Sequence, residues 1–165
     1  MSPASSPFSA SYREAREKFA DAAQSAGAAL TSITHPLRGP SGEVLAMDVA
    51  WLGPRDADAV LLCLSGVHGA EGYAGSGAQI AWLNALQGRE LPQGVAALLV
   101  HGANPWGFAH GLRGTEDNID INRNWLDHTQ PHPTNPLYSE IHGALCPQDL
   151  SASSVDAMRD AGCRF

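Results

Sequence analysis

The sequence predicts an α/β fold built on a mixed, mainly parallel sheet with helices on both faces. Residues 59–64 and 95–100 are continuous apolar runs, which are typical of strands buried on both faces. Between these runs, residues 66–77 contain five glycines, and the apolar side chains of residues 78–87 have helical spacing. A strand, helix, strand order with a crossover of this length implies that the two strands are parallel.

The N-terminal part of the sequence predicts one helix and two more strands. Residues 12–29 carry apolar side chains on one helical face, and Gly27 is a suitable stop. Residues 30–34 and 43–52 are apolar or alternating segments separated by a turn-forming stretch, so we expect two antiparallel strands at the edge of the sheet. The run at residues 59–64 is then the central strand, with its cysteine in the core.

The ends of the chain have weaker patterns. We expect residues 1–11, rich in Ser, Pro and Ala, to form a disordered N-terminal tail. Residues 12–165 are expected to belong to a single domain, because a chain of 165 residues can bury one core. After Trp125 the chain is loop-like, and residues 138–145 predict a short helix.

Composition argues against several classes of function. A formal net charge of -7 and a pI near 5.3 disfavour a nucleic-acid or anionic-membrane surface, since either needs a clustered basic face. Cys63, Cys146 and Cys163 are odd in number and lack CxxC spacing, which favours reduced thiols in the cytoplasm. No stretch resembles a secretory signal or reaches the length of a membrane span. We therefore expect a cytoplasmic protein.

A histidine and a glutamate three residues apart follow the first apolar run. His68 and Glu71 lie in the sequence Ser-Gly-Val-His-Gly-Ala-Glu-Gly, whose glycines allow a tight loop that can aim both side chains at one metal ion. The simpler interpretation is a strand-end histidine followed by a glutamate that caps the next helix, where the helix dipole favours a carboxylate. The metal site requires that the imidazole and the carboxylate converge.

A second polar segment covers residues 120–125, with the sequence Asp-Ile-Asn-Arg-Asn-Trp. Asn122 and Arg123 supply an amide and a guanidinium, the donors suited to holding a carboxylate in a fixed orientation. The alternative for Arg113 and Arg123 is ordinary salt bridging on an acidic surface.

These motifs resemble those of the zinc carboxypeptidase (M14) superfamily. His68-Gly-Ala-Glu71, Asn104-Pro-Trp-Gly107, Arg113 and residues 120–125 come in the order found in that superfamily. Residues 12–147 look most like a bacterial DUF2817-like branch of unknown function, related to aspartoacylase and succinylglutamate desuccinylase. The resemblance implies a zinc carboxypeptidase-like fold, of which this chain would be the N-terminal part, incomplete at its C-terminus.

The resemblance also implies a role for each matched residue. His68 and Glu71 would bind Zn²⁺, and Arg113 would stabilise the oxyanion that develops on the substrate carbonyl. Asn122 and Arg123 would hold the terminal carboxylate of the substrate. The aspartate at position 120 matches one that accepts a hydrogen bond from the zinc-binding histidine and so orients its ring, although a strand-end cap is the simpler alternative.

Two functional groups have no match in this sequence. The superfamily takes its third zinc ligand and its general base from a later region than this chain contains. The remaining candidates are poor matches because of their expected positions in loops, in a helix or at a position without a ligand in the superfamily; they are His101, Glu116, His128, His132 and His142. We therefore expect weak metal binding by the N-terminal part of a hydrolase.

The sequence predicts zinc-dependent hydrolysis of an amide or peptide bond next to a carboxylate-bearing group, with a small peptide or N-acyl amino acid as substrate. The alternative is a non-catalytic module that retains the family core and binds a carboxylate ligand. A serine hydrolase is disfavoured because alanines stand two residues before and after Ser76. A phosphate-binding loop is disfavoured because no Lys-Ser or Lys-Thr pair follows the glycines.

Overall fold

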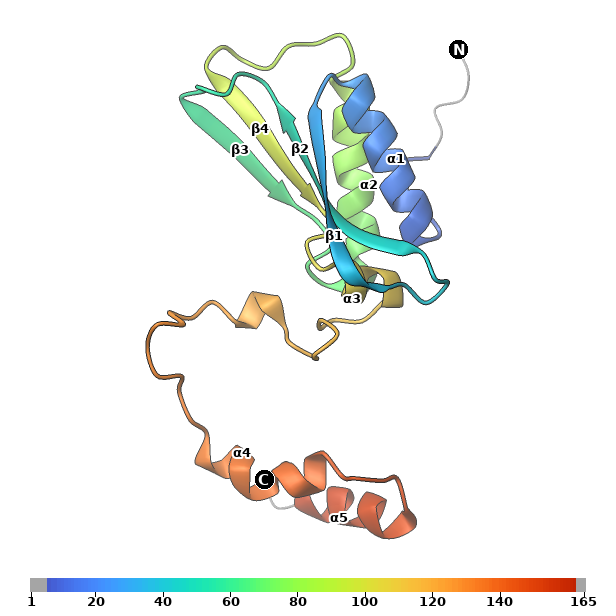
Figure 1. Ribbon diagram of the computed structural model, residues 1–165, viewed down its shortest axis with the longest axis vertical. Helices are drawn as coiled ribbons and strands as arrows, with labels where there is room; N and C mark the ends of the chain where they lie inside the picture. The colour runs from blue at the N-terminus through green and yellow to red at the C-terminus, as the bar shows by residue number, and fades with distance from the viewer. Residues whose placement is uncertain (1–5, 163–165) are drawn as a thin grey trace. The chain divides into compact units, whose positions relative to one another are not determined.

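The computed structural model describes residues 6–162, and these form two compact units, residues 6–125 and 126–162. Figure 1 shows the elements in chain order. The first unit contains α1 (Tyr12–Ser25), β1 (Ala29–Arg38), β2 (Val44–Leu52), β3 (Ala59–Leu64), α2 (Gly69–Ala85), β4 (Val95–His101), α3 (Pro105–His110) and the 3-10 helix η1 (Ile121–Arg123). The second contains α4 (Pro136–Leu145) and α5 (Ala152–Gly162).

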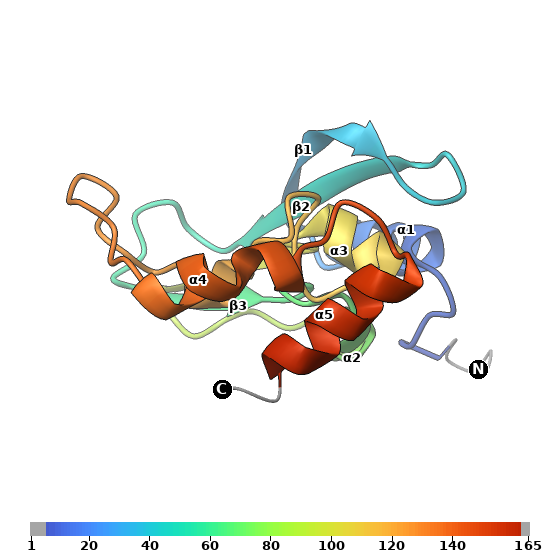
Figure 2. The same ribbon diagram turned by 90° about the horizontal axis from the view of Figure 1, so that it is seen from below.

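The four strands form one mixed sheet in the order β1-β2-β4-β3. β3 and β4 are parallel and are joined through α2, as the strand, helix, strand pattern predicts. The pairs β1–β2 and β2–β4 are antiparallel, so parallel pairing is confined to β3 and β4. Figures 1 and 2 show that β1 and β2 extend beyond the other two strands as a twisted hairpin. The α/β class and the mixed sheet are confirmed.

Helices α1 and α2 lie side by side on one face of the sheet, whereas the sequence predicts helices on both faces (Figure 1). They share a core with β2 and β4 whose buried residues are Phe19, Ala22, Ala23, Ala50, Ile80, Leu83, Ala97 and Leu99. The alanines of α1 leave room for α2 beside it, which is why both helices fit on the same face. Full burial of a side chain such as Phe19 contributes roughly 1.5–3 kcal/mol.

Helix α1 is capped by Ser11, whose hydroxyl accepts a hydrogen bond from the Glu14 amide. The Glu14 carboxylate in turn accepts from the backbone amide of Ala10, the residue before the cap, which ties the preceding chain to the first turn of α1. Residues 1–5 of the predicted N-terminal tail lie outside the described residues. Within residues 6–11, Lys18 donates to the Ser6 and Phe8 carbonyls at 2.9 and 2.7 Å.

Helix α2 begins at Gly69, nine residues before the predicted helical segment at residue 78. The glycines of residues 66–77 predict a loop, but residues 69–77 belong to α2. Glycine is needed in this part of the helix because neighbouring groups lie too close for a side chain. An added Cβ would lie 2.7 Å from the Phe108 ring at Gly72 and 2.7 Å from the Phe8 ring at Gly77. The glycines therefore permit close packing of α2 rather than a flexible loop.

Strand β3 occupies the edge of the sheet, so the prediction of a buried central strand is wrong. Val60, Leu61, Leu62 and Leu64 are each between 46% and 56% exposed, and Cys63 is exposed as well. Within the described residues, β3 pairs only with β4, and α2 packs against α1 and β4 instead of covering β3. An apolar run indicates that a strand prefers burial, but it does not reveal how many neighbours the strand has.

A polar pair is buried between α2 and β4. The His101 ring stacks on Phe19 with 4.4 Å between the ring centroids, and His101 Nε2 lies 2.9 Å from the Ser76 hydroxyl. Asp48 pairs with His101 in the β2–β4 register and forms an ion pair with Arg16, from Nε to Oδ2, of 2.6 Å. Burial lowers the pKa of His101 from its ordinary value of 6.5 to about 4, because the imidazolium cannot be solvated there.

The second unit is a pair of helices. α4 contains the predicted helix at residues 138–145 and begins at Asn135, whose side chain accepts from the Tyr138 amide. α5 has no counterpart among the predicted elements. Cys163 lies outside the described residues. None of the helices in residues 6–162 is both long enough and apolar enough to span a membrane.

The exposure of β3 is testable by comparing two leucines. We expect Leu83→Ala to lower the free energy of unfolding by about 2–5 kcal/mol, because Leu83 is fully buried. Leu62→Ala should cost less than about 1 kcal/mol, because Leu62 is 56% exposed. Urea unfolding of both variants measures this difference, and an equal loss in the two would show that β3 is buried.

The buried imidazole predicts acid sensitivity. Between pH 6.5 and pH 4 the unfolded chain binds a proton at His101 that the folded chain does not, so stability falls as the pH is lowered. From pH 7 to pH 4 this group should remove roughly 3 kcal/mol from the free energy of unfolding. Urea unfolding of wild type and His101→Asn at both pH values isolates the effect, since the variant should lack this part of the decrease. An identical decrease in both proteins would contradict it.

Candidate metal centre

His68 and Glu71 come from the junction between β3 and α2. Residues 65–67 connect the strand to the helix, and His68 is the residue that precedes the first turn of α2. Gly66 has a φ of +67°, in the left-handed region that favours glycine, and a Cβ there would lie 2.9 Å from the Gly102 Cα. The connection is therefore tight, and it places Glu71 one turn along the helix from the histidine.

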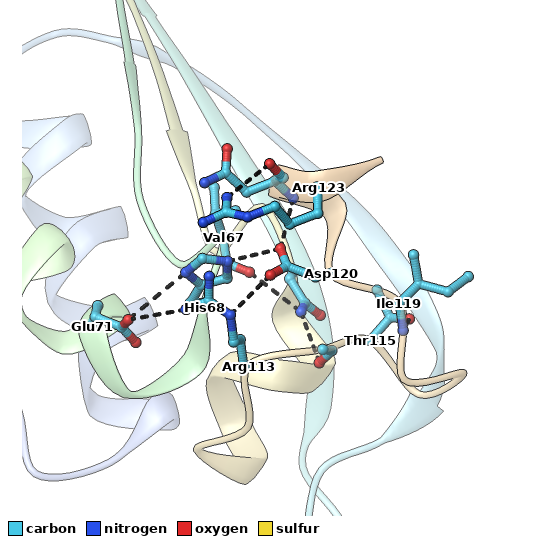
Figure 3. Close-up of polar contacts among 11 residues, drawn as sticks. Val67, His68, Glu71, Arg113, Thr115, Ile119, Asp120 and Arg123 are labelled. Atoms are coloured by element: carbon cyan, nitrogen blue, oxygen red, sulfur yellow. Dashed lines mark hydrogen bonds and ion pairs between the residues drawn. The ribbon is translucent and has the colours of Figure 1, made fainter. Parts of the chain in front are cut away.

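The two side chains converge. His68 Nδ1 lies 3.8 Å from Glu71 Oε1, and Figure 3 shows the imidazole and the carboxylate facing each other. Two ligands about 2.0–2.2 Å from a tetrahedral zinc ion lie about 3.4 Å apart, so the two atoms would close by a few tenths of an ångström to share one ion. An imidazole nitrogen and a carboxylate oxygen are also ligands that zinc accepts.

The other ring nitrogen of His68 faces Asp120. His68 Nε2 lies 2.9 Å from Asp120 Oδ1. This hydrogen bond is the main cause that holds the pKa of Asp120 below its ordinary value, and bonds from the Asn122 amide and Arg113 act in the same direction. An ionised carboxylate can only accept, so Nε2 donates this bond, and Nδ1 is the ring nitrogen that faces Glu71. Asp120 thus fixes the orientation of the His68 ring, as carboxylates beside metal-binding histidines do.

Arg113 lies beside the same pair. Its Nε donates to Asp120 Oδ2 at 2.8 Å, and its Nη1 lies 3.9 Å from Glu71 Oε1. The side chain is 53% exposed, so part of the guanidinium remains accessible. Asp120 therefore holds His68 with one oxygen and Arg113 with the other.

Asn122 and Arg123 belong to η1, directly after Asp120. The Asn122 amide donates to Asp120 Oδ1 at 2.9 Å, and Arg123 Nη1 donates to the Asn122 carbonyl at 3.1 Å. Both residues are exposed, and Figure 3 shows Arg123 on the same side as His68 and Asp120. Among the described residues, Arg123 forms no ion pair with a carboxylate, so ordinary salt bridging does not account for it.

A cavity of about 200 Å³ opens beside the pair. It is lined by residues 64–67, His68, Glu71, Gly72 and Gly75. The cavity lies beyond the carboxyl end of β3, where ligands of parallel strands collect.

Within the first unit, the remaining sequence candidates, His101 and Glu116, do not join the pair. His101 is buried against Phe19 and bonded to Ser76, and Glu116 contacts His35 at 3.1 Å. The same burial removes Ser76 as a nucleophile. His128, His132 and His142 belong to the second unit. Within residues 6–162, no group of three or more His, Cys, Asp or Glu side chains is arranged to hold a metal ion. If it binds zinc, the pair would supply two ligands of the three that a catalytic zinc site usually takes from protein.

The sequence analysis assigns no role to Asn104 beyond its place in a motif, although Asn104 joins the loops around the site. An asparagine before a proline at the start of a short helix is a sequence signal for a helix cap, and Asn104 has this position in α3. Its other hydrogen bonds depend on residues far away in the sequence, so no local pattern indicates them.

Comparison with known proteins finds one family whose sequence pattern this chain matches. Residues 8–165 match the family described as "Protein of unknown function (DUF2817)". No curated protein matches the chain.

Several solved structures are similar at low identity. A glutaminyl cyclase from Tannerella forsythia is 16% identical, with a TM-score of 0.45, over 75% of this chain and 50% of that one. A Zn-dependent exopeptidase from Parabacteroides distasonis is 13% identical, with a TM-score of 0.42, over 86% and 50%. A putative Zn-dependent exopeptidase from Bacteroides vulgatus is 14% identical, with a TM-score of 0.40, over 59% and 41%. This chain spans at most half the length of these three proteins.

The segment after β3 that carries Gly69 lies close to the segment that carries Gly107 and Leu112, so we expect that position 69 does not tolerate a side chain. A Cβ on Gly69 would strike the Gly107 carbonyl and lie 2.6 Å from the Leu112 oxygen and 2.7 Å from its nitrogen. We expect Gly69→Ala to lower the free energy of unfolding by roughly 1–3 kcal/mol. Gly143→Ala is the control, because nothing lies within 4 Å of that helical position. Chemical denaturation compares the two, and a loss no larger than in the control would contradict the contact.

Proposed function

The chain belongs to the DUF2817 family of proteins of unknown function, and we propose that it contributes to a zinc-dependent hydrolase site. The proposed reaction is cleavage of an amide or peptide bond next to a carboxylate-bearing group, as in a carboxypeptidase or a deacylase. The proposed substrate is a small peptide or an N-acyl amino acid. We further propose that residues 12–165 belong to a single metallocarboxypeptidase-like domain, whose third ligand and general base come from outside the described residues.

The observation that carries this proposal is the orientation of the His68 ring. One nitrogen donates to Asp120 at 2.9 Å, and the other lies 3.8 Å from the Glu71 carboxylate. A histidine that only ends a strand does not need a carboxylate on each side. An imidazole backed by a carboxylate is the usual arrangement of a metal-binding histidine.

His68 and Glu71 would hold the ion. The chemistry that zinc supplies in such sites is polarisation of a carbonyl and activation of a water molecule. Arg113 is bonded to Asp120 through Nε, which leaves its Nη donors for the carbonyl oxygen as negative charge develops on it. Asp120 keeps His68 and Arg113 in place throughout, because each of its oxygens accepts from one of them.

The exposed guanidinium of Arg123 and the amide of Asn122 would hold the substrate carboxylate. A guanidinium can pair with a carboxylate through two parallel hydrogen bonds, which fixes orientation as well as position. The position of these residues directly after Asp120 supports a carboxylate anchor next to the proposed reaction centre.

A second candidate function is a non-catalytic module that binds a carboxylate ligand. The observation that favours it is that no third metal ligand joins His68 and Glu71 within residues 6–162. Such a module would use the same arginines, Arg113 and Arg123, without hydrolysis. Sensitivity to a chelator separates the two functions. Hydrolysis that a chelator abolishes and added zinc restores supports the enzyme, whereas ligand binding that is indifferent to a chelator supports the module.

The carboxylate anchor is tested by Arg123→Ala. We expect the variant to raise the KM for a peptide with a free carboxylate by about tenfold to a hundredfold, because a charge-assisted hydrogen bond contributes about 1.5–3 kcal/mol. The KM for the corresponding amide should change little. Steady-state kinetics on both substrates measures the difference.

Arg159→Ala is the matched control for this experiment. Arg159 is an exposed arginine of α5 whose described ion pair is with Asp156 in the same helix, so its loss should leave both KM values unchanged. An equal effect of Arg123→Ala on the carboxylate and on the amide would exclude the assigned role.

A further inference from the structure

Asn104 is a buried side chain that contacts three separate segments. Its Oδ1 accepts from the Gly107 amide at 2.9 Å, which caps α3. Its Nδ2 donates to the Gly114 carbonyl at 3.0 Å and to the Val67 carbonyl at 3.4 Å. One side-chain amide therefore joins the start of α3 to two other loops.

Each of these two loops carries one residue of the proposed site next to the point of contact. Val67 directly precedes His68, and Gly114 directly follows Arg113. The Asn104 amide thus bonds to the peptide units adjacent to a proposed metal ligand and to the proposed oxyanion donor. No other side chain for which the described residues show hydrogen bonds contacts both of these peptide units.

Backbone contacts support the same junction. The backbone N–H of Asn104 donates to the Gly66 carbonyl at 2.8 Å, and the backbone N–H of Gly69 donates to the Leu112 carbonyl at 2.9 Å. The first contact lies just before His68 and the second just after it. The segment that carries His68 is therefore held on both sides, with Asn104 taking part on one of them.

We propose that Asn104 is a positioning residue of the site, whose side-chain amide sets the distance between the His68 loop and the Arg113 loop. This inference rests on the proposed function. Asp120 joins the two residues at their side-chain ends, through 2.9 and 2.8 Å contacts, whereas Asn104 joins them at the backbone. The contacts of Asp120 with the side chains and of Asn104 with the backbone together fix the relative orientation of His68 and Arg113, which either set of contacts alone would leave free to rotate.

The amide group is specific for this role. Bridging two carbonyls while accepting from a backbone N–H requires two donors and one acceptor in one side chain, which only Asn and Gln supply. A serine retains the acceptor that caps α3, but it has one donor on a shorter side chain. Asn104→Ser therefore removes the bridge and keeps the cap, and Asn104→Asp keeps the cap and the size while removing both donors.

The first measurement is binding of Co²⁺, which reports coordination through its visible spectrum. We expect Asn104→Ser and Asn104→Asp to weaken Co²⁺ binding about tenfold or more and to change the absorption bands, as loss of supporting contacts around a metal site does. Asn135→Ser is the matched control, because Asn135 caps α4 in the same way and lies in the second unit. It should bind Co²⁺ like wild type.

The second measurement does not need a metal. Hydrogen exchange of the Gly69 amide reports its bond to the Leu112 carbonyl, and we expect exchange at least tenfold faster in both Asn104 variants. Amides of β4 should exchange at the wild-type rate. Faster exchange in β4 to the same degree would indicate general loosening and would overturn a positioning role.

The two measurements separate the possible failures. If wild type does not bind Co²⁺, the proposed metal site is wrong, and the Gly69 exchange rate alone decides whether Asn104 tethers the loops. If wild type binds Co²⁺ and both variants match its affinity, spectrum and Gly69 exchange, the inference about Asn104 is wrong while the metal site stands.

Discussion

The arrangement of the site depends on the carboxylate of Asp120. Its two oxygens accept from His68 and Arg113 at 2.9 and 2.8 Å, so one small group determines where a ring nitrogen and a guanidinium point. The Asn122 amide also donates to this carboxylate, which ties the exposed residues of η1 to the same centre. A group that receives three donors is strongly stabilised in its ionised form, which explains the direction of its pKa shift.

The sheet determines which loops can reach this carboxylate. Because β3 and β4 are parallel, both strands end at the same edge, and the loops that follow them meet there. The loop after β3 carries His68, and the chain after β4 passes through α3 to Arg113 and Asp120. Close contact between these loops relies on Gly66 and Gly69, where a side chain would collide with the neighbouring backbone. The polar site is thus a direct result of one parallel strand pair with small residues at its end.

The sequence predicts where helices and strands form better than it predicts which elements pack against one another. Residues 12–29 and 95–100 have patterns that match α1 and β4 closely, because burial on one helix face or in a strand leaves a clear periodicity. The spacing of His68 and Glu71 also predicts their approach, since three residues span about one helical turn. The exposed edge position of β3 and the burial of Ser76 against His101 depend on contacts between distant segments. The hydrogen bonds of Asn104 are invisible to sequence patterns for the same reason.

The composition of α2 links the site to the order of folding. Four of its residues, Gly69, Gly72, Gly75 and Gly77, are glycines, and each lowers intrinsic helix stability by roughly 0.5–1 kcal/mol relative to alanine. As an isolated peptide this segment would be largely unstructured, so its helical form depends on the rings and strands against which it packs. The approach of His68 to Glu71 at the start of α2 therefore depends on the surrounding tertiary structure, and it forms only once that structure has condensed around the helix.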